Sequence, residues 1–129
     1  MLGIDIVSIE RMQRLVERFG IKGLMRFLSA DEIELCYKNS SKAFNISRIA
    51  GFWAAKEACA KALGVGICKE LSFLDMTISK DSKNAPLMNL TQSKMREFGI
   101  DEIALSISHD GGFAIAAVLC KRCEKSIES

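Results

Sequence analysis

The chain has 129 residues, of which 49% are hydrophobic and 26% charged, and its formal net charge is +2. This composition is typical of a folded globular protein rather than a disordered one, and the length suits one domain over residues 1–129. No apolar run approaches the roughly 20 residues that cross a bilayer, so we expect no membrane partner, and the small net charge argues against nucleic acid as a partner.

Five cysteines are present, and the first residues lack the basic segment that opens a secretory signal. We therefore expect a cytoplasmic protein whose thiols are reduced. Cys120 and Cys123 form a C-x-x-C pair, but a zinc site of this kind needs a second pair at suitable spacing, and none is evident. We interpret the pair as inert thiols.

The N-terminal segment predicts a strand and then a helix. Residues 2–7 alternate so that Asp5 faces away from Ile4 and Ile6, and Ser8 can cap the helix that follows. The core-facing spacing of that helix is carried by Met12, Leu15, Val16 and Phe19. Its opposite, exposed face carries a row of arginines one turn apart: Arg11, Arg14 and Arg18.

The rest of the chain predicts alternating helices and strands. A capping box at Ser29 and Glu32 starts a short helix, and a long central helix covers residues 45–63 and ends at Gly64. Further strands are predicted at 73–79 and 87–90, a helix at 91–98, and a hairpin at 103–109 and 113–119. This order of elements indicates an α+β fold with a mainly antiparallel sheet.

Two carboxylates and a lysine are the first candidates for chemistry. Asp5 lies among apolar neighbours, where a carboxylate is costly unless it is paired or binds a metal; the alternative is an exposed strand residue or a helix cap. Glu57 and Lys61 are four residues apart and share a face with Trp53 on the apolar stripe of the long helix. They form either an ordinary surface ion pair or part of a ligand site.

Two further features could contact a ligand. His109, the only histidine, ends a strand before a turn, where an imidazole is either structural or an acid, base or phosphate contact. Gly64 and Gly66 follow the long helix without the pattern of a Walker loop. Glycines there permit close approach of the backbone to a long ligand.

Taken in order, these motifs resemble a known family. Gly3-Ile4-Asp5-Ile6-Val7 is followed by Arg11, and Trp53-Ala54-Ala55-Lys56-Glu57-Ala58 continues to Lys61-Ala62-Leu63-Gly64-Val65-Gly66. Leu71-Ser72-Phe73 and Ser106-Ile107-Ser108-His109 complete the set. The chain resembles the holo-acyl-carrier-protein synthases, the small single-domain class of 4′-phosphopantetheinyl transferases, over most of its length. A lone Gly-x-Asp is a weak signal, but the ordered set in a chain of this length is specific.

The resemblance implies a fold, a reaction and a metal. Such enzymes pack their sheet on a long central helix and move the 4′-phosphopantetheine arm of coenzyme A to a serine of apo-acyl carrier protein. They release adenosine 3′,5′-bisphosphate and support fatty acid biosynthesis. By position, Asp5 and Glu57 hold Mg²⁺, with Mn²⁺ as the alternative, since hard cations prefer carboxylate oxygens. Lys61 contacts a phosphate, and Glu57 removes the serine proton, either directly or through a metal-bound water.

The resemblance also implies where the substrates and further subunits bind. The residues that it assigns to coenzyme A are Lys61, Gly64, Gly66, Ser108 and His109. The arginine row Arg11, Arg14 and Arg18 becomes a docking face for the acidic carrier protein; without the resemblance it is a solvated basic helix face. Small members of the family are homotrimers with active sites between subunits.

One departure from the family stands in the helix motif. Many relatives have a basic residue just before the aromatic residue, whereas this chain has Phe52 before Trp53. A phosphate contact is therefore missing there, and Lys42 and Arg48 are the candidate substitutes.

Two other functions compete with the transferase. One is a non-catalytic module that binds a carrier protein or a nucleotide, against which the intact set of Asp5, Glu57 and Lys61 argues. The other is a nucleic-acid-binding domain that uses the arginine helix. The mild charge and the single Tyr and Trp argue against it.

Overall fold

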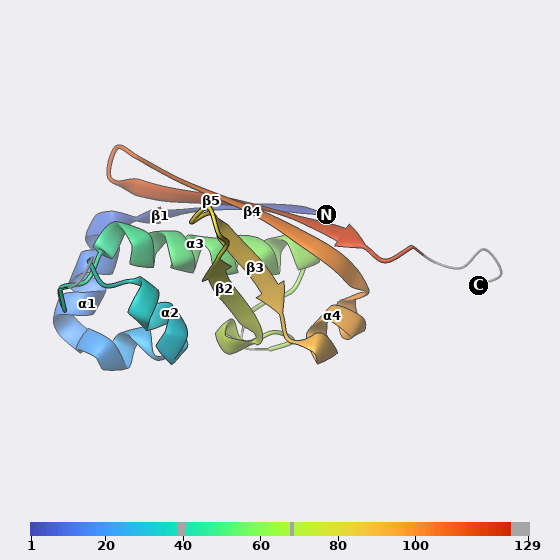
Figure 1. Ribbon diagram of the computed structural model, residues 1–129, viewed down its shortest axis with the longest axis horizontal. Coiled ribbons are helices and arrows are strands. Elements are labelled where there is room, and N and C mark those ends of the chain that lie inside the picture. The colour runs from blue at the N-terminus through green and yellow to red at the C-terminus, as the bar shows by residue number, and fades with distance from the viewer. Residues whose placement is uncertain (39–40, 68, 125–129) are drawn as a thin grey trace.

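The computed structural model describes residues 1–38, 41–67 and 69–124. Its centre is the long helix α3 (Ile46–Leu63), which Figure 1 shows lying beneath one sheet and behind a second. The first sheet is antiparallel with strand order β1-β5-β4, and the second is an antiparallel pair of β2 and β3. The strands are β1 (Leu2–Ser8), β2 (Met76–Lys80), β3 (Pro86–Leu90), β4 (Ile100–Asp110) and β5 (Phe113–Arg122). The predicted α+β fold with antiparallel sheets on a central helix is confirmed.

Shorter helices lie at the two ends of α3. Figure 1 shows α1 and α2 at the end where α3 begins and α4 at the end where it stops. These helices are α1 (Ile9–Leu24), α2 (Ala30–Leu35), the 3₁₀ helix η1 (Phe73–Asp75) and α4 (Gln92–Phe98). Within the residues that the structure describes, no helix is long and apolar enough to cross a membrane.

The helix ends follow from local hydrogen bonds that the sequence predicts. Ser8 accepts the backbone N–H of Arg11 at the start of α1, and Ser29 and Glu32 form a complete capping box at the start of α2. Gly64 ends α3 in the left-handed conformation (φ 72°), which a residue with a Cβ adopts at a cost. The cap predictions are therefore confirmed.

Three details differ from the sequence predictions. Phe19, expected in the core, is 50% exposed, because Gly20 takes a non-helical conformation and bends α1 at that point. The strand expected from Phe73 begins only at Met76, because a capping box of Ser72 and Asp75 first winds one 3₁₀ turn. The hairpin strands extend further from the turn than predicted, since β4 begins at Ile100 rather than at residue 103 and β5 ends at Arg122 rather than at residue 119.

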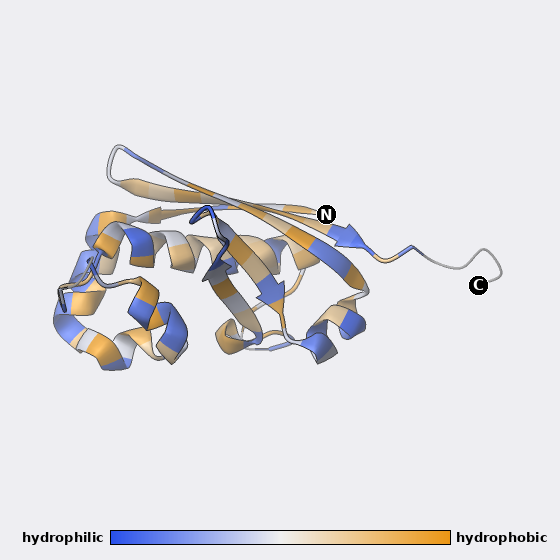
Figure 2. Ribbon diagram, viewed as in Figure 1, coloured by the Kyte–Doolittle hydropathy of each residue, from blue (hydrophilic) through white to orange (hydrophobic). Residues whose placement is uncertain are grey.

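The two faces of the three-stranded sheet differ in what covers them. The inner face packs small side chains against α3, and its buried members on β5 are Ala114, Ala116, Val118 and Cys120. The outer face carries large apolar side chains that are mostly exposed: Leu2, Ile4, Ile6, Ile115 and Leu119. Figure 2 shows hydrophobic residues along β1 and β5 and hydrophilic ones on α2 and α4. One chain alone therefore leaves an apolar sheet face in water.

Candidate active site

The first strand lies directly against the second half of α3. A Cβ on Gly3 would stand 2.0 Å from the carbonyl oxygen of Ala58 and 2.6 Å from the backbone nitrogen of Ala62, so only glycine fits. This contact fixes the height of β1 along the helix. It sets Asp5, two residues further on the same face of the strand, against Glu57 and Lys61.

Asp5 and Lys61 form an ion pair. Lys61 Nζ donates to Asp5 Oδ1 at 2.8 Å and to the carbonyl oxygen of Ile4 at 3.3 Å. The hydrogen bond to Asp5 raises the pKa of Lys61. The Asp5 side chain is 14% exposed and the Lys61 side chain 55% exposed, so the carboxylate is held while the ammonium reaches solvent.

Glu57 is half-buried beside this pair. Burial raises the pKa of its carboxyl group, the negative charge of Asp5 raises it further, and Lys61 opposes both effects. The two carboxylates repel each other, and the ion pair of Lys61 is with Asp5. The arrangement therefore favours a cation or a proton between them.

Asp5 and Glu57 line a cavity of about 260 Å³ together with Trp53 and Arg11. Among the described residues, no group of three or more His, Cys, Asp and Glu side chains could hold a metal by itself. Mg²⁺ commonly takes one or two carboxylates and completes its octahedron with waters and substrate phosphates. The two carboxylates and their electrostatics fit that ion.

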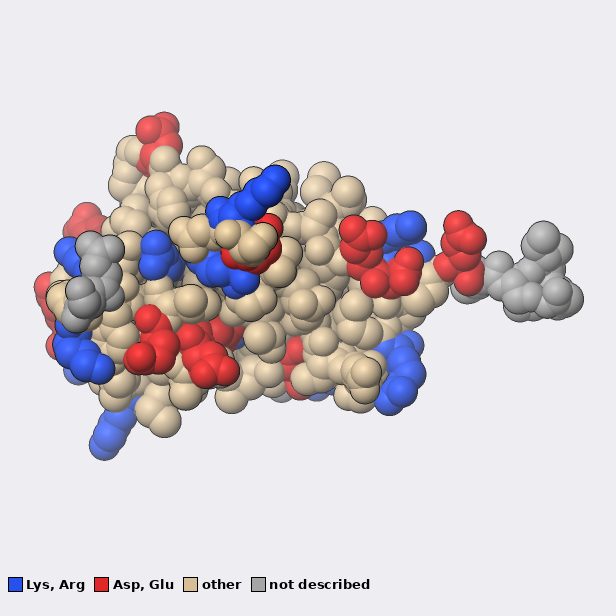
Figure 3. Space-filling model, in the orientation of Figure 1, with Lys and Arg blue, Asp and Glu red and all other residues tan. Residues whose placement is uncertain are grey.

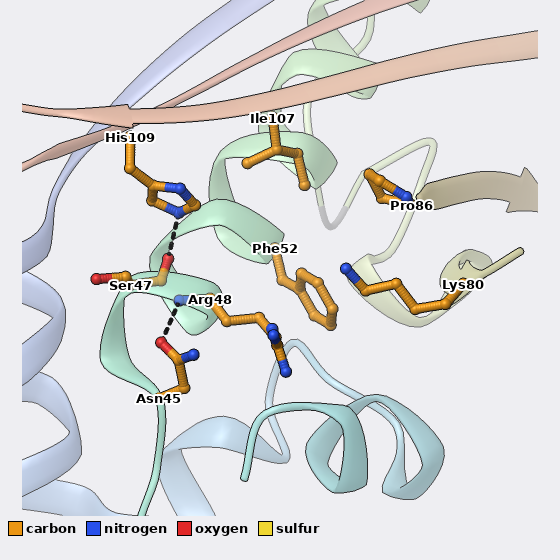
Figure 4. A pocket seen from close by; sticks show the side chains of 8 residues that line it. All are labelled: Asn45, Ser47, Arg48, Phe52, Lys80, Pro86, Ile107 and His109. Carbon is orange, nitrogen blue, oxygen red and sulfur yellow. Dashed lines mark hydrogen bonds between the residues drawn. The ribbon is translucent and has the colours of Figure 1, made fainter. Parts of the chain in front are cut away.

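A second cavity, of about 300 Å³, lies at the N-terminal end of α3 (Figure 4). His109 Nε2 is 2.8 Å from the carbonyl oxygen of Ser47. A Cβ on Gly51 would stand 2.9 Å from Ile107 and 3.3 Å from His109 Nε2, so this glycine lets β4 approach the helix. His109 is thereby placed over the first turns of α3.

Two cations converge on Phe52 in this second cavity. Figure 4 shows Arg48 and Lys80 reaching toward the Phe52 ring from two elements, and no carboxylate is among the described residues that line the cavity. Burial lowers the pKa of Lys80, and the charge of Arg48 lowers it further. The charge of Asp81, which does not line the cavity, opposes these effects on Lys80. On the face in Figure 3, basic side chains gather around an acidic one beside the turn between β2 and β3, and other acidic side chains lie over α2. Two cations in a cavity lined by no described carboxylate favour an anionic ligand.

The two candidate substitutes for the missing basic residue lie in different places. Arg48 lines the cavity around Phe52, whereas Lys42 lies over the Tyr37 ring, 5.2 Å from its centroid. Lys80 was missed by the sequence analysis, because it lies 28 positions from Phe52 on another element and belongs to no motif. In the sequence Lys80 stands out only as a lysine at the end of a strand, just before a turn.

The remaining predicted ligand contacts are not brought together in one chain. Gly64 and Gly66 lie beyond the C-terminal end of α3, about 25 Å from Ser47 at the helical rise of 1.5 Å per residue. Ser108 is exposed and pairs with Ile115 on the outer face of the sheet, while His109 faces α3. The cavity around His109 therefore includes neither the two glycines nor Ser108.

The arginine row begins at the first cavity. Arg11 lines it, and Arg14 and Arg18 follow along the exposed face of α1. Arg14 forms an ion pair with Glu10, and the Arg18 guanidinium lies over the Phe19 ring at 5.1 Å. The row leads from the paired carboxylates outward over the surface.

The cysteines lie in different surroundings. Cys120 is buried and Cys123 is exposed, so the two sulfurs of the C-x-x-C pair face different environments. Burial raises the pKa of the Cys36 thiol to about 12, which leaves it a poor nucleophile. Cys68 lies outside the described residues.

The fold and motifs agree with comparisons to known proteins. Residues 1–118 match the model of the 4′-phosphopantetheinyl transferase superfamily. The holo-[acyl-carrier-protein] synthase of Helicobacter acinonychis is 60% identical over 92% of this chain and 98% of its own length. That of Sulfurimonas denitrificans is 56% identical over 92% of both chains.

Solved structures give the same result. The crystal structure of the Helicobacter pylori holo-[acyl-carrier-protein] synthase in complex with coenzyme A superposes with a TM-score of 0.85 at 58% identity, over 94% of this chain and 100% of that one. The Neisseria meningitidis synthase superposes with a TM-score of 0.82 at 31% identity, over 94% and 97%. This chain therefore belongs to the 4′-phosphopantetheinyl transferase superfamily.

Proposed function

We infer that this chain transfers the 4′-phosphopantetheine arm of coenzyme A to a serine of apo-acyl carrier protein, with release of adenosine 3′,5′-bisphosphate. The observation that carries this inference is the meeting of Asp5, Glu57 and Lys61 at one cavity. Relatives that share the fold and more than half of the residues are holo-[acyl-carrier-protein] synthases, one of them in complex with coenzyme A. Support of fatty acid biosynthesis in the cytoplasm belongs to the same proposal.

The residues around the cavity suit the steps of this reaction. The serine Oγ attacks the phosphorus that carries the pantetheine arm, and the bond from that phosphorus to the adenosine-bearing phosphate breaks. Glu57, which lines the cavity, is the acceptor of the serine proton, either directly or through a water. Lys61, whose side chain is 55% exposed, can contact a phosphate oxygen and offset its charge.

Asp5 and Glu57 are the residues that would hold Mg²⁺ or Mn²⁺. Bound there, the ion would neutralise charge on the diphosphate during the displacement. Burial raises the pKa of Glu57 and the charge of Asp5 raises it further, and the positive charge of the ion would oppose both effects.

The second cavity is proposed as the anchor for a phosphate of coenzyme A. His109, Arg48 and Lys80 supply imidazole and cationic donors around Phe52. Arg48 and Lys80 thereby replace the basic residue that many relatives have at the position of Phe52. Gly64, Gly66 and Ser108, which lie elsewhere on this chain, are proposed to contact the ligand from a neighbouring subunit.

A homotrimer with sites between subunits would unite these parts. The exposed apolar face of the three-stranded sheet supports it, because Leu2 is paired with Leu119 and Ile6 with Ile115 across β1 and β5. Ser108 lies on that same face. Further copies of this chain would cover the face and bring their own ligand contacts to each cavity.

The arginine row is proposed as the carrier-protein dock. It starts beside Glu57 and runs along exposed α1, so an acidic partner bound there would present its serine to the cavity. Charge complementarity of this kind steers association and weakens as salt increases.

One assay tests the proposed function. The protein is mixed with apo-acyl carrier protein, coenzyme A and Mg²⁺, and mass spectrometry measures the mass of the phosphopantetheine adduct on the carrier. We expect the adduct only when all components are present. If several carrier proteins bind but stay unmodified, the non-catalytic carrier-binding module replaces the transferase.

A further inference from the structure

A buried ion pair lies directly beneath the candidate active site. Lys56 Nζ donates to Glu32 Oε1 at 2.8 Å, and the two side chains are 0% and 1% exposed. Within the described part of the chain these are the buried charged side chains. Lys56 immediately precedes Glu57 on α3, so the pair adjoins the machinery without lining its cavity.

The other two N–H groups of the Lys56 ammonium donate hydrogen bonds to backbone carbonyl groups. It donates to the carbonyl oxygen of Phe27 at 2.7 Å and to that of Phe73 at 3.1 Å. With Glu32 this accounts for the three donors of an ammonium group. The lysine therefore ties the segment after α1 and the start of η1 to the middle of α3.

The Glu32 carboxylate is equally occupied. Oε1 also accepts the backbone N–H of Ser29 at 2.8 Å, and Oε2 accepts that of Ile78 at 2.7 Å. Through this carboxylate, α2 and β2 are joined to the same point on α3. A capping residue of a short helix thus becomes one centre of the hydrogen-bond network that holds α2, β2 and α3 together.

Stability alone is a weak reason for such a pair. Two buried charges lose their hydration, and replacing both with apolar groups of similar volume is often neutral or stabilising. The charged groups instead fix the relative positions of segments, because each hydrogen bond holds one segment in place against the helix.

The segments that Lys56 holds are those that support Trp53. The ring centroids of Phe27 and Phe73 lie 4.8 Å and 5.0 Å from that of Trp53. Trp53 lies one helical turn before Glu57, and both line the cavity with Asp5. The carbonyl groups bound by Lys56 and the rings that pack on Trp53 thus belong to the same two residues.

We propose that Lys56, paired with Glu32, is a positioning residue for phosphopantetheine transfer, which holds Trp53 and Glu57 as one rigid wall of the cavity. It touches no reacting atom and acts through Phe27 and Phe73. The proposal rests on the transferase function proposed above.

The test uses the double variant Lys56→Met/Glu32→Leu, which removes both charges and keeps apolar volume. Trp53 is the only tryptophan of the chain, so its fluorescence reports the cavity wall without any substrate. We expect a folded protein with a lower unfolding temperature, because four backbone groups lose their hydrogen-bond partners. We also expect a red-shifted Trp53 emission with easier quenching and a kcat at least about tenfold lower, since small misplacements of catalytic geometry are costly. The KM for coenzyme A should change far less.

Two further variants make the result decisive. Ile100→Ala removes a buried side chain on β4 away from the cavity and controls for general destabilisation. Glu32→Gln leaves an amide oxygen for Lys56 and for the backbone N–H of Ser29 but sets its amide nitrogen against the backbone N–H of Ile78. We therefore expect a smaller loss of kcat and a smaller shift in emission.

Three outcomes would overturn the proposal. They are a double variant with wild-type kcat and emission, an equal loss of kcat in Ile100→Ala, and a double variant that fails to fold. If the wild-type protein transfers nothing, the proposed function fails, whereas the Trp53 emission still decides whether the pair positions the wall.

Discussion

Lys61 Nζ lies 2.8 Å from Asp5 Oδ1, although the two residues are 56 positions apart in the chain. This contact joins the first strand to the last turns of α3 and leaves the lysine largely in solvent. An ammonium group that one carboxylate holds and that solvent still reaches is also accessible to an anionic ligand. The following predictions start from this pair and its surroundings.

Glu57→Gln should abolish transfer and leave the fold intact. The raised pKa of Glu57 means that the folded state binds its proton more tightly than the unfolded state, whose value is near 4.5. The free energy of unfolding therefore falls as pH rises from 4.5 through the raised value. The variant should lose this decline and melt at a higher temperature than the wild type at neutral pH.

Thermal unfolding with and without Mg²⁺ checks this prediction. Mg²⁺ should raise the melting temperature of the wild type and change that of Glu57→Gln little, and the exposed Glu102→Gln is the matched control. Full transfer activity in Glu57→Gln would remove this residue from the metal site.

Gly3→Ala should be strongly destabilising. The new Cβ would overlap the backbone of α3, which cannot move aside as a side chain can. We expect a loss of about 3 kcal/mol or more, at or beyond the upper end for overpacked cores, measured by urea unfolding. Gly66→Ala has nothing within 4 Å of the new Cβ and serves as the control. Equal stability of the two variants would contradict the close approach of β1 and α3.

Arg14→Glu/Arg18→Glu should raise the KM for the carrier protein at low salt by at least about tenfold, because charge reversal adds repulsion to lost attraction. The KM for coenzyme A should stay near the wild-type value. Arg96→Glu/Arg122→Glu, at two exposed positions outside α1, changes the net charge by the same amount and is the control. If both KM values rise together, the arginine row is not a dock.

Arg48→Met/Lys80→Met should raise the KM for coenzyme A with little change in the KM for the carrier protein. The physical reason is the loss of both cations that converge on Phe52. Steady-state kinetics with coenzyme A and with its 3′-dephospho form checks which phosphate they bind. A loss confined to coenzyme A assigns the cavity to the 3′-phosphate, and an unchanged KM for both substrates removes the cavity from the binding site.

Leu119→Lys should dissociate the assembly. A charge on the exposed sheet face costs more when the face is buried against other copies, since buried charges lose hydration. Light scattering after size exclusion measures the mass, and Leu74→Lys, which is similarly exposed but lies on η1, is the control. A monomeric wild type would contradict the proposed trimer, and so would a trimeric Leu119→Lys.

Local signals made most of the fold predictable. Capping residues, glycines at helix ends and the turn before Phe113 act over a few positions, and each is read directly from neighbouring residues. The pair of Glu57 and Lys61 could be placed on one face for the same reason. The errors, such as Phe19, arose where one glycine changed the direction of a helix.

Contacts between distant segments could not be predicted in this way. Helix α3 is apolar on nearly every side, so its pattern did not show that Lys56 points into the core and Glu57 toward the cavity. Glu32 appeared only as part of a capping box, and its second role as the partner of Lys56 depends on a neighbour 24 positions away. Lys80, on β2, and Arg48, on α3, line the same cavity only because the chain between them folds back.

The position of β1 between β5 and α3 has a consequence for how the chain matures. Its hydrogen-bonding partner begins at Phe113, and even the terminal amino group of Met1 donates to the carbonyl oxygen of Cys120. During synthesis β1 cannot pair until β5, the last strand that the structure describes, has been made. Pairing between segments so far apart in the sequence is slow to form. A chain that stops before β5 keeps the contacts of Gly3 and Asp5 with α3 but lacks the strand that pairs with every residue of β1. The candidate active site is therefore fully supported only when nearly all of the chain has been synthesised.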